Sequence, residues 1–233
     1  MRSMHLVVLT LGFCGAAAAQ DTGLSVSVGA RAWFTQWTTF SYYTQGNNNL
    51  ALTQESASEK LVLIPLLSVR YGDVVGSLSY FPTTHVSFSN GNRGTRQELD
   101  LNLGYTVIPG VTLTLGYKKI SQRSEPYRYE PAGPTAGVSL NAPLAGAYSI
   151  YGVLGLGKLK TPKTGPDTVV KFSTDYRLTE VGMAYTLSGD RLPRRWTFTG
   201  GYRIQVMSSK EAFPGQDGRD TTQGFTFGAI ATF

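Results

Sequence analysis

The chain has 233 residues, of which 27 are glycine and 12% are aromatic, and its 21 Lys and Arg exceed its 15 Asp and Glu to give a net charge of +6. The basic residues are scattered rather than gathered on one helix or interleaved with aromatic residues, which argues against a nucleic-acid partner. After the N-terminal segment, no run of 18 apolar residues exists that could form a membrane helix. A membrane-spanning form of this chain would therefore cross with strands.

The N-terminal segment has the features of a secretory signal peptide. A basic residue, an apolar run over 6–13 and a stretch of small residues ending at Ala19 follow one another. We expect cleavage after Ala19, which makes residues 1–19 the signal peptide and leaves 20 Lys and Arg against 15 Asp and Glu. Bulky Phe13 precedes the single cysteine, Cys14, and argues against a lipoprotein signal. The mature chain would then have no cysteine, which excludes disulfides and thiol chemistry.

Residues 20–233 are expected to form one all-β domain, because apolar and polar residues alternate with a period of two along most of it. The polar segments 38–58, 124–134 and 160–169 are expected to be loops. Connections after odd-numbered strands are mostly longer than those after even-numbered ones, which places both termini at the end with short turns. The expected strands are 24 to about 37, 59–71, 74–88, 95–107, 111–118, 135–142, 148–158, 171–187, 196–207 and 224–233.

Residues 95–118 show the pattern most clearly, as two alternating arms joined by a tight turn. If Val107 pairs with Val111, Asp100 lies opposite Lys118 on the polar face. Opposite charges in such a cross-strand pair stabilise a sheet by roughly 0.2–1 kcal/mol. Each arm has about 10 residues, the length that a tilted strand needs to cross a bilayer.

The signal segment, the alternating strands over 24–233 and the terminal aromatic Phe233 resemble those of bacterial outer-membrane β-barrel proteins. The resemblance implies a transmembrane antiparallel up-and-down β-barrel, which we expect to have ten strands. Eight strands is the alternative, because the glycine-rich pair over 135–158 is the weakest. The resemblance also implies an outer-membrane location, with outer-membrane lipids and lipopolysaccharide as partners. The barrel-assembly machinery would read Phe233, and the protein is expected to be a monomer.

Alternation alone does not say which face lines the lumen, since a soluble lipid-binding barrel turns its apolar face inward. Charged residues on the polar face suit a narrow interior in which they pair, and aromatic residues near strand ends suit a membrane-interface girdle. We therefore expect the apolar face outside. The predicted lumen charges are Arg31, Arg70, Arg96, Glu98, Asp100, Lys118, Glu180 and Arg203. The predicted girdle comprises Trp37, Tyr71, Tyr105, Tyr117, Trp196 and Phe233.

The predicted function is that of a structural or surface-recognition barrel with a charged, plugged lumen, no cofactor, no metal and no enzymatic activity. A narrow, weakly anion-selective pore is the alternative, because five of the eight lumen charges are cations and three are acids. Cations in the predicted loops are a second candidate for recognition, because Lys and Arg side chains bind phosphate groups such as those of lipopolysaccharide. They are Arg123, Arg128, Lys158, Lys160, Lys163, Lys210 and Arg219.

A lipid hydrolase is a further alternative, carried by His85, Ser87 and Glu98. Pairing of neighbouring strands could bring Glu98 beside His85, so that histidine acts as base and glutamate orients it. The spacing is similar to the His-x-Ser and later Glu pattern of outer-membrane lipid A deacylases. It departs from that family because the trio lies in the first half of the chain and on the predicted lumen face. The Asp-His pairing of ten-stranded outer-membrane proteases has no matching motif.

Overall fold

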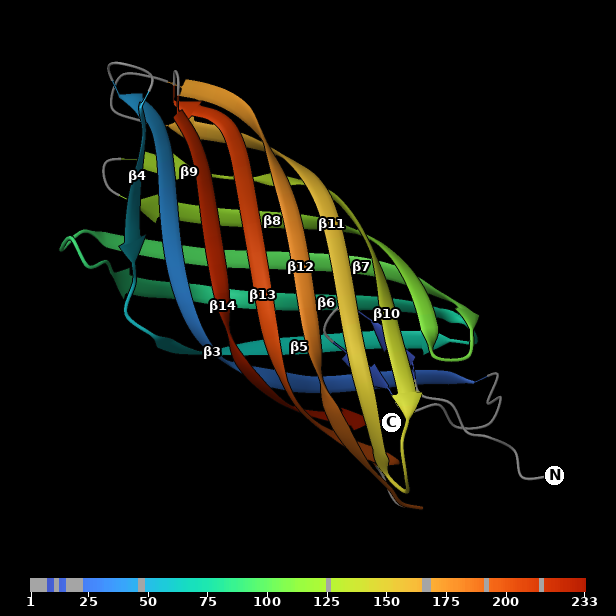
Figure 1. Cartoon of the computed structure of the whole chain (residues 1–233). Helices are drawn as coiled ribbons and strands as arrows, with labels where there is room; N and C mark the ends of the chain where they lie inside the picture. The colour runs from blue at the N-terminus through green and yellow to red at the C-terminus, as the bar shows by residue number, and fades with distance from the viewer. Residues whose placement is uncertain are drawn as a thin grey trace.

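The structure, a computed structural model, describes residues 8–10, 13–15, 23–45, 49–124, 127–164, 169–190, 193–213 and 216–233. Ten long antiparallel strands close into a barrel (Figure 1), which confirms the predicted all-β class and the count of ten. The cleavage site expected after Ala19 lies outside the described residues. Among the described residues there is no helix of the length and apolar character that a membrane crossing requires.

Each barrel strand pairs with the next along the chain, and β14 closes the ring by pairing with β3. The barrel strands are β3 (Leu24–Gln45), β5 (Lys60–Tyr71), β6 (Val74–Ser87), β7 (Arg93–Ile108), β8 (Val111–Ser124), β10 (Ala132–Pro143), β11 (Tyr148–Thr164), β12 (Val169–Ser188), β13 (Arg195–Phe213) and β14 (Gln216–Thr232). Outside the ring, β4 (Asn49–Ser56) pairs with β3, and β9 (Tyr127–Tyr129) bridges β8 and β11. β1 (Val8–Thr10) and β2 (Phe13–Gly15) form a separate two-stranded sheet.

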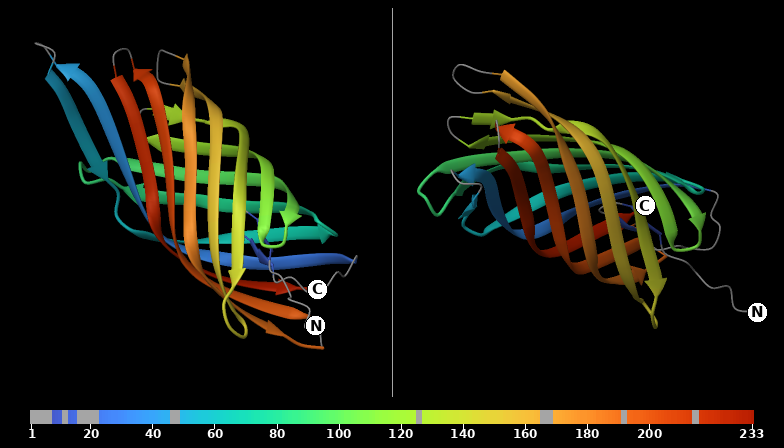
Figure 2. Two further views of the ribbon diagram at one scale, coloured as in Figure 1. Left: turned by 45° about the vertical axis from the view of Figure 1, so that its right-hand side comes forward. Right: turned by 45° about the horizontal axis from the view of Figure 1, so that its top comes forward.

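The start of β3 and the end of β14 lie at one end of the barrel, here called the terminal end, and the opposite end is called the loop end (Figure 1). In all three segments predicted to be loops, most of the described residues are strand instead. Residues 38–45 continue β3 and residues 49–56 return as β4, residues 127–129 form β9, and residues 160–164 and 169 belong to the far ends of β11 and β12. Backbone pairing continues there without an apolar face, so alternation could not reveal it. Figure 2 shows the β3–β4 hairpin reaching beyond its neighbours at the loop end.

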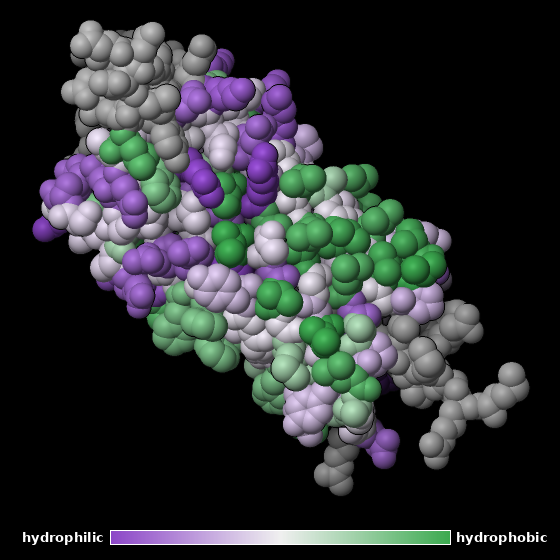
Figure 3. Space-filling model, viewed as in Figure 1, coloured by the Kyte–Doolittle hydropathy of each residue, from purple (hydrophilic) through white to green (hydrophobic). Residues whose placement is uncertain are grey.

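The outer wall carries the apolar half of each alternation, as predicted. Leu63, Leu103 and Leu115 are all more than 60% exposed, which a soluble barrel with an apolar interior would not show. Hydrophobic side chains gather on the wall nearer the terminal end, and hydrophilic ones gather toward the loop end (Figure 3). Of the predicted girdle, the exposed members are Tyr71, Tyr105, Tyr117, Trp196 and Phe233. Trp37 was wrongly placed: it is buried inside the barrel, on the face it shares with Arg31.

The interior is more apolar than the charge pattern predicted. β5 directs Val62, Ile64 and Leu66 inward, and they are each at most 5% exposed. They belong to a buried cluster that includes Trp33 and Tyr176. β5 is therefore apolar on both faces, which explains why it has the most hydrophobic sequence of the set.

The hairpin of β7 and β8 has the predicted pairing of Asp100 with Lys118, although the turn differs from expectation. Ile108, rather than Val107, lies opposite Val111, because the register shifts by one residue next to the turn. Gly110 has a positive φ of 81°, a conformation that glycine adopts at no steric cost. The irregularity is confined to the turn, so the pairing farther along the strands is kept.

Candidate functional site

The first cluster of lumen charges is built around Glu98 of β7. Lys118 Nζ lies 2.6 Å from Glu98 Oε2 and 2.8 Å from Asp100 Oδ1. Arg96 Nε donates a hydrogen bond to Glu98 Oε1 at 2.7 Å, and Gln205 Nε2 from across the lumen donates to the same oxygen at 3.0 Å. Glu98 and Lys118 are almost fully buried, whereas the Asp100 side chain is 22% exposed. Every charge of this cluster therefore faces an opposite one.

The second cluster is built around Glu180 of β12. Arg203 NH1 lies 3.0 Å from Glu180 Oε2, and Arg31 NH2 lies 3.5 Å from Oε1. The Tyr151 hydroxyl donates to Oε1 at 3.1 Å. A Cβ at position 201 would lie 2.6 Å from that hydroxyl and 2.6 Å from the carbonyl oxygen of Val181, so only glycine fits where the Tyr151 side chain reaches over β12 to β13.

Aromatic rings pack against the cations of both clusters and help to fill the lumen. The guanidinium of Arg203 lies 5.2 Å from the ring centre of Trp33, and Lys118 Nζ lies 5.1 Å from that of Tyr176. Both distances are within the range of a cation–π interaction. Trp33 and Tyr176 are at most 4% exposed. The middle of the lumen is thus occupied by paired charges and packed rings.

Seven of the eight predicted lumen charges converge in these clusters, and Arg70 does not. Arg70 Nε donates to the carbonyl oxygen of Gly72 at 2.8 Å, in a turn at the terminal end. The converging set has four cations and three acids, a net charge of +1 rather than the expected +2. The functional role of these residues stays a prediction.

The structure does not bring His85, Ser87 and Glu98 together. Glu98 lies inside the lumen opposite Phe81, whereas His85 pairs with Thr95 and is exposed on the outer wall, as is Ser87. The cause is a bulge in β6 between Phe81 and Thr84, which shifts the register against β7 by one residue. One extra residue exchanges the two faces of a strand. The predicted placement of His85 in the lumen is therefore wrong.

The predicted assembly signal, Phe233, lies at the terminal end beside the start of β3. Its backbone N–H donates to the carbonyl of Val26 at 2.9 Å, and the Val26 N–H donates back at 3.3 Å. The last residue is thus held in the ring by backbone pairing. Recognition of Phe233 during assembly stays a prediction.

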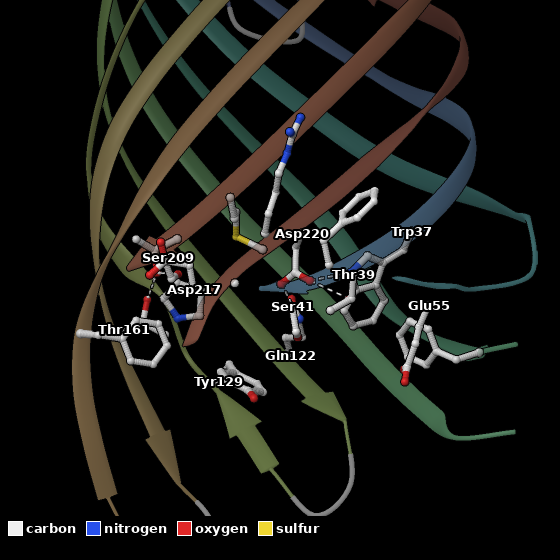
Figure 4. Close-up of a pocket in the computed structure, with 18 residues that line it drawn as sticks. Trp37, Thr39, Ser41, Glu55, Gln122, Tyr129, Thr161, Ser209, Asp217 and Asp220 are labelled. Atoms are coloured by element: carbon white, nitrogen blue, oxygen red, sulfur yellow. Dashed lines mark hydrogen bonds between the residues drawn. The ribbon is translucent and has the colours of Figure 1, made fainter. Parts of the chain in front are cut away.

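A cavity at the loop end, above the charge clusters, is the feature that sequence reasoning missed. It has a volume of about 110 Å³. Strands from opposite sides of the barrel line it, together with β4 and β9 (Figure 4). One wall is a chain of hydroxyls in which Thr174 Oγ1 lies 2.6 Å from Thr161 Oγ1 and 2.8 Å from Ser209 Oγ. The opposite wall carries Asp220 and aromatic rings.

Asp220 is a carboxylate of this cavity that accepts three side-chain hydrogen bonds (Figure 4). Thr39 Oγ1 donates to its Oδ1 at 2.7 Å and Trp37 Nε1 donates to the same oxygen at 3.4 Å. Gln122 Nε2 donates to Oδ2 at 2.9 Å. Burial, and after it the charge of Asp220, raises the pKa of the neighbouring Tyr129 above its ordinary value. Ionisation of the Tyr129 phenol is therefore disfavoured in the folded protein.

The cavity could not be found from sequence because its members are scattered and its walls depend on β4 and β9. Asp220 of β14 pairs with Thr39 of β3, a strand far away in the chain, and Gln122 pairs with Tyr129 of the short strand β9. Among the described residues, no group of three or more His, Cys, Asp or Glu is placed to hold a metal ion.

Comparison with known proteins supports the fold and leaves the activity open. No protein-family model matches the chain, and no curated protein sequence matches it. The outer membrane protease OmpT from Escherichia coli is similar in structure, with a TM-score of 0.57 and 11% identity over 92% of this chain and 97% of that one. Ail, the attachment invasion locus protein of Yersinia pestis, matches with a TM-score of 0.27 and 14% identity over 87% and 98% of the two chains. The fold of this chain is that of the bacterial outer-membrane β-barrels.

Proposed function

Starting from a bacterial outer-membrane β-barrel fold, we propose that the protein is an integral outer-membrane barrel with a closed lumen, which acts by recognition at its loop end. The observation that carries the proposal is the order of features along the lumen. A cavity opens at the loop end. On its terminal-end side, the Glu98 and Glu180 clusters and their aromatic neighbours fill the cross-section of the lumen. Such a barrel presents a binding surface without a conducting path.

The outer wall supports the membrane part of the proposal. Exposed leucines form an apolar band, and aromatic residues such as Tyr71, Tyr105 and Trp196 lie on it toward the terminal end. Aromatic rings at that depth suit the membrane–water interface. The orientation known for such barrels places short turns in the periplasm and long loops outside. The cavity would then face the exterior of the cell.

We propose a non-enzymatic role. The one histidine among the described residues, His85, lies on the outer wall, on the face opposite to Glu98. A triad through His85 has no support from this arrangement. The likeness to a protease at 11% identity concerns the fold and carries no activity to this chain.

Lipopolysaccharide is the proposed lipid partner. Ala132 of β10 pairs with Lys119 of β8 on one side and with Lys160 of β11 on the other, and both lysines are exposed on the outer wall. They lie on the loop-end side of Tyr117, at the border of the apolar band. Two lysines at the loop-end border of the apolar band are placed to bind the phosphate groups of a lipid head group.

Labelling of single cysteines in intact cells tests the location and the orientation, because the mature chain is expected to contain no cysteine of its own. Asp217→Cys at the loop end should react with a membrane-impermeant maleimide. Asp73→Cys, in a turn at the terminal end, should react only after the outer membrane is permeabilised. Reaction of Asp73→Cys in intact cells, without reaction of Asp217→Cys, would reverse the proposed orientation.

A further inference from the structure

We infer that the loop-end cavity binds an organic cation that carries N–H donors, such as an ammonium or amidinium group on a small apolar body. The inference rests on the proposed function and names the ligand class for its recognition surface. Three independent observations carry it: an unsatisfied buried acceptor, the charge of the lining and the aromatic walls.

The unsatisfied acceptor belongs to Gln122. An ionised carboxylate only accepts hydrogen bonds, so the bond between Gln122 and Asp220 fixes the amide with Nε2 toward Asp220. The Oε1 atom is then the free end. Gln122 is 5% exposed, it lines the cavity, and among the described residues its Oε1 accepts no hydrogen bond. A buried acceptor without a partner is unfavourable, and a donor in the cavity would satisfy it.

The charge of the lining favours a positive donor. Glu55, Asp217 and Asp220 line the cavity together with one cation, Arg219, so the lining has a net charge of −2 in a chain whose net charge is +6. The known donors to Asp220 are a hydroxyl, an indole and an amide, all neutral. A carboxylate accepts about four hydrogen bonds, which leaves room for one from a ligand. An N–H cation between Asp220 and Gln122 would serve both acceptors.

The aromatic walls suit the body of such a ligand. Trp37 and Phe88 lie edge to face with ring centres 4.9 Å apart, and Tyr129 lines the same cavity. A cation that has left water is stabilised by ring faces. Arg96 already lies 5.6 Å from the Trp37 ring, but its NH1 donates to Thr222 at 2.9 Å and its Nε donates to Glu98. Arg96 is thus engaged in the cluster below.

The volume sets the size of the group that enters. A cavity of about 110 Å³ is smaller than the ~150 Å³ apolar cavity that accommodates benzene. A charged head group and part of a ring fit, and the rest of a larger ligand would extend toward the loop end.

Titration of the refolded protein with benzamidine tests the inference, read from the indole N–H resonance of Trp37 and by calorimetry. The resonance is assigned by its loss in Trp37→Phe. Benzamidine should shift it and bind at least tenfold more tightly than benzyl alcohol or benzoate. Asp220→Asn should weaken benzamidine at least tenfold, and Asp73→Asn, at the opposite end, should leave its affinity unchanged. Retained heat-resistant migration on a gel shows that each variant is folded.

A second variant separates donor recognition from charge alone. Gln122→Met removes the unsatisfied acceptor and should weaken benzamidine severalfold, while benzyltrimethylammonium, a cation without N–H donors, should bind both proteins equally. Tighter binding of benzyl alcohol or benzoate than of benzamidine would overturn the inference but leave recognition at the cavity intact. The absence of a benzamidine-induced shift in the wild type also overturns it. Ion currents through the wild-type barrel would instead count against the proposed function.

Discussion

Asp100 and Lys118 lie opposite each other on β7 and β8, and Lys118 Nζ joins the Asp100 carboxylate at 2.8 Å while it also binds Glu98 at 2.6 Å. One ammonium thus serves two acids. Lys118→Asp would place three carboxylates together, so it should be the more destabilising of the two single charge reversals of this pair. Asp100→Lys should cost less, because Asp100 is partly exposed.

The double variant Asp100→Lys with Lys118→Asp restores an opposite pair at these two positions. It should resist urea better than Lys118→Asp alone, as measured by the loss of heat-resistant migration on a gel. Equal sensitivity of the double variant and Lys118→Asp would mean that the pair contributes nothing to stability.

Glu180 holds two arginines in the lumen, so its neutralisation should be costly. Glu180→Gln keeps the shape and leaves Arg31 and Arg203 without their shared acid. Removing one partner of a buried ion pair costs about 3–5 kcal/mol. The matched control is Glu130→Gln in the exposed pair with Arg128, where about 0–1 kcal/mol is expected. Equilibrium urea unfolding in lipid vesicles measures both, and similar losses would contradict the buried cluster.

The bulge in β6 predicts which side chains face outward beyond Pro82. A cysteine at position 85 should react with a water-soluble maleimide when the protein is folded in micelles, and a cysteine at Val86, which is buried, should not. Without the bulge the two positions would exchange faces. Faster reaction at position 86 than at position 85 would therefore refute the register shift.

The raised pKa of Tyr129 predicts a local pH dependence at the loop end. Burial and the charge of Asp220 disfavour the phenolate in the folded state. Stability from this group is fully present below the ordinary tyrosine pKa of about 10 and is lost as pH rises through the higher folded value. The difference in absorbance at the phenolate band between wild type and Tyr129→Phe should appear only well above pH ~10. A difference already complete at pH ~10 would contradict the burial of Tyr129.

Period-two alternation predicted the strands and their count, because lipid and lumen demand opposite side chains on neighbouring residues. The pairing of Asp100 with Lys118 followed from the same rule. The outward apolar face was predicted from the charges on the polar face and the aromatic residues near strand ends, not from the alternation alone. Trp37 was misplaced because its residue type was given more weight than its position, although it shares the inward face of β3 with Arg31.

The alternation did not reveal the register of β6 or the strands at the loop end, for two physical reasons. A single extra residue in β6 reverses the faces beyond it, and Pro82, a residue type found at bulges, does not by itself say whether an extra residue is present. Beyond the membrane, strands need no apolar face, so β4 and the far ends of β11 and β12 looked like loops. The cavity around Asp220 is built from such segments, and its contacts span up to 183 residues of sequence.

The central claim is that the lumen is closed by its charge clusters, and single-channel recording in a planar bilayer tests it most directly. The refolded wild type should insert without discrete current steps in a salt gradient, while Glu180→Gln and Glu98→Gln, which unpair the clusters, should begin to show them. Discrete anion-favouring steps in the wild type that disappear in Arg203→Glu would contradict the closed lumen and identify the protein as a pore.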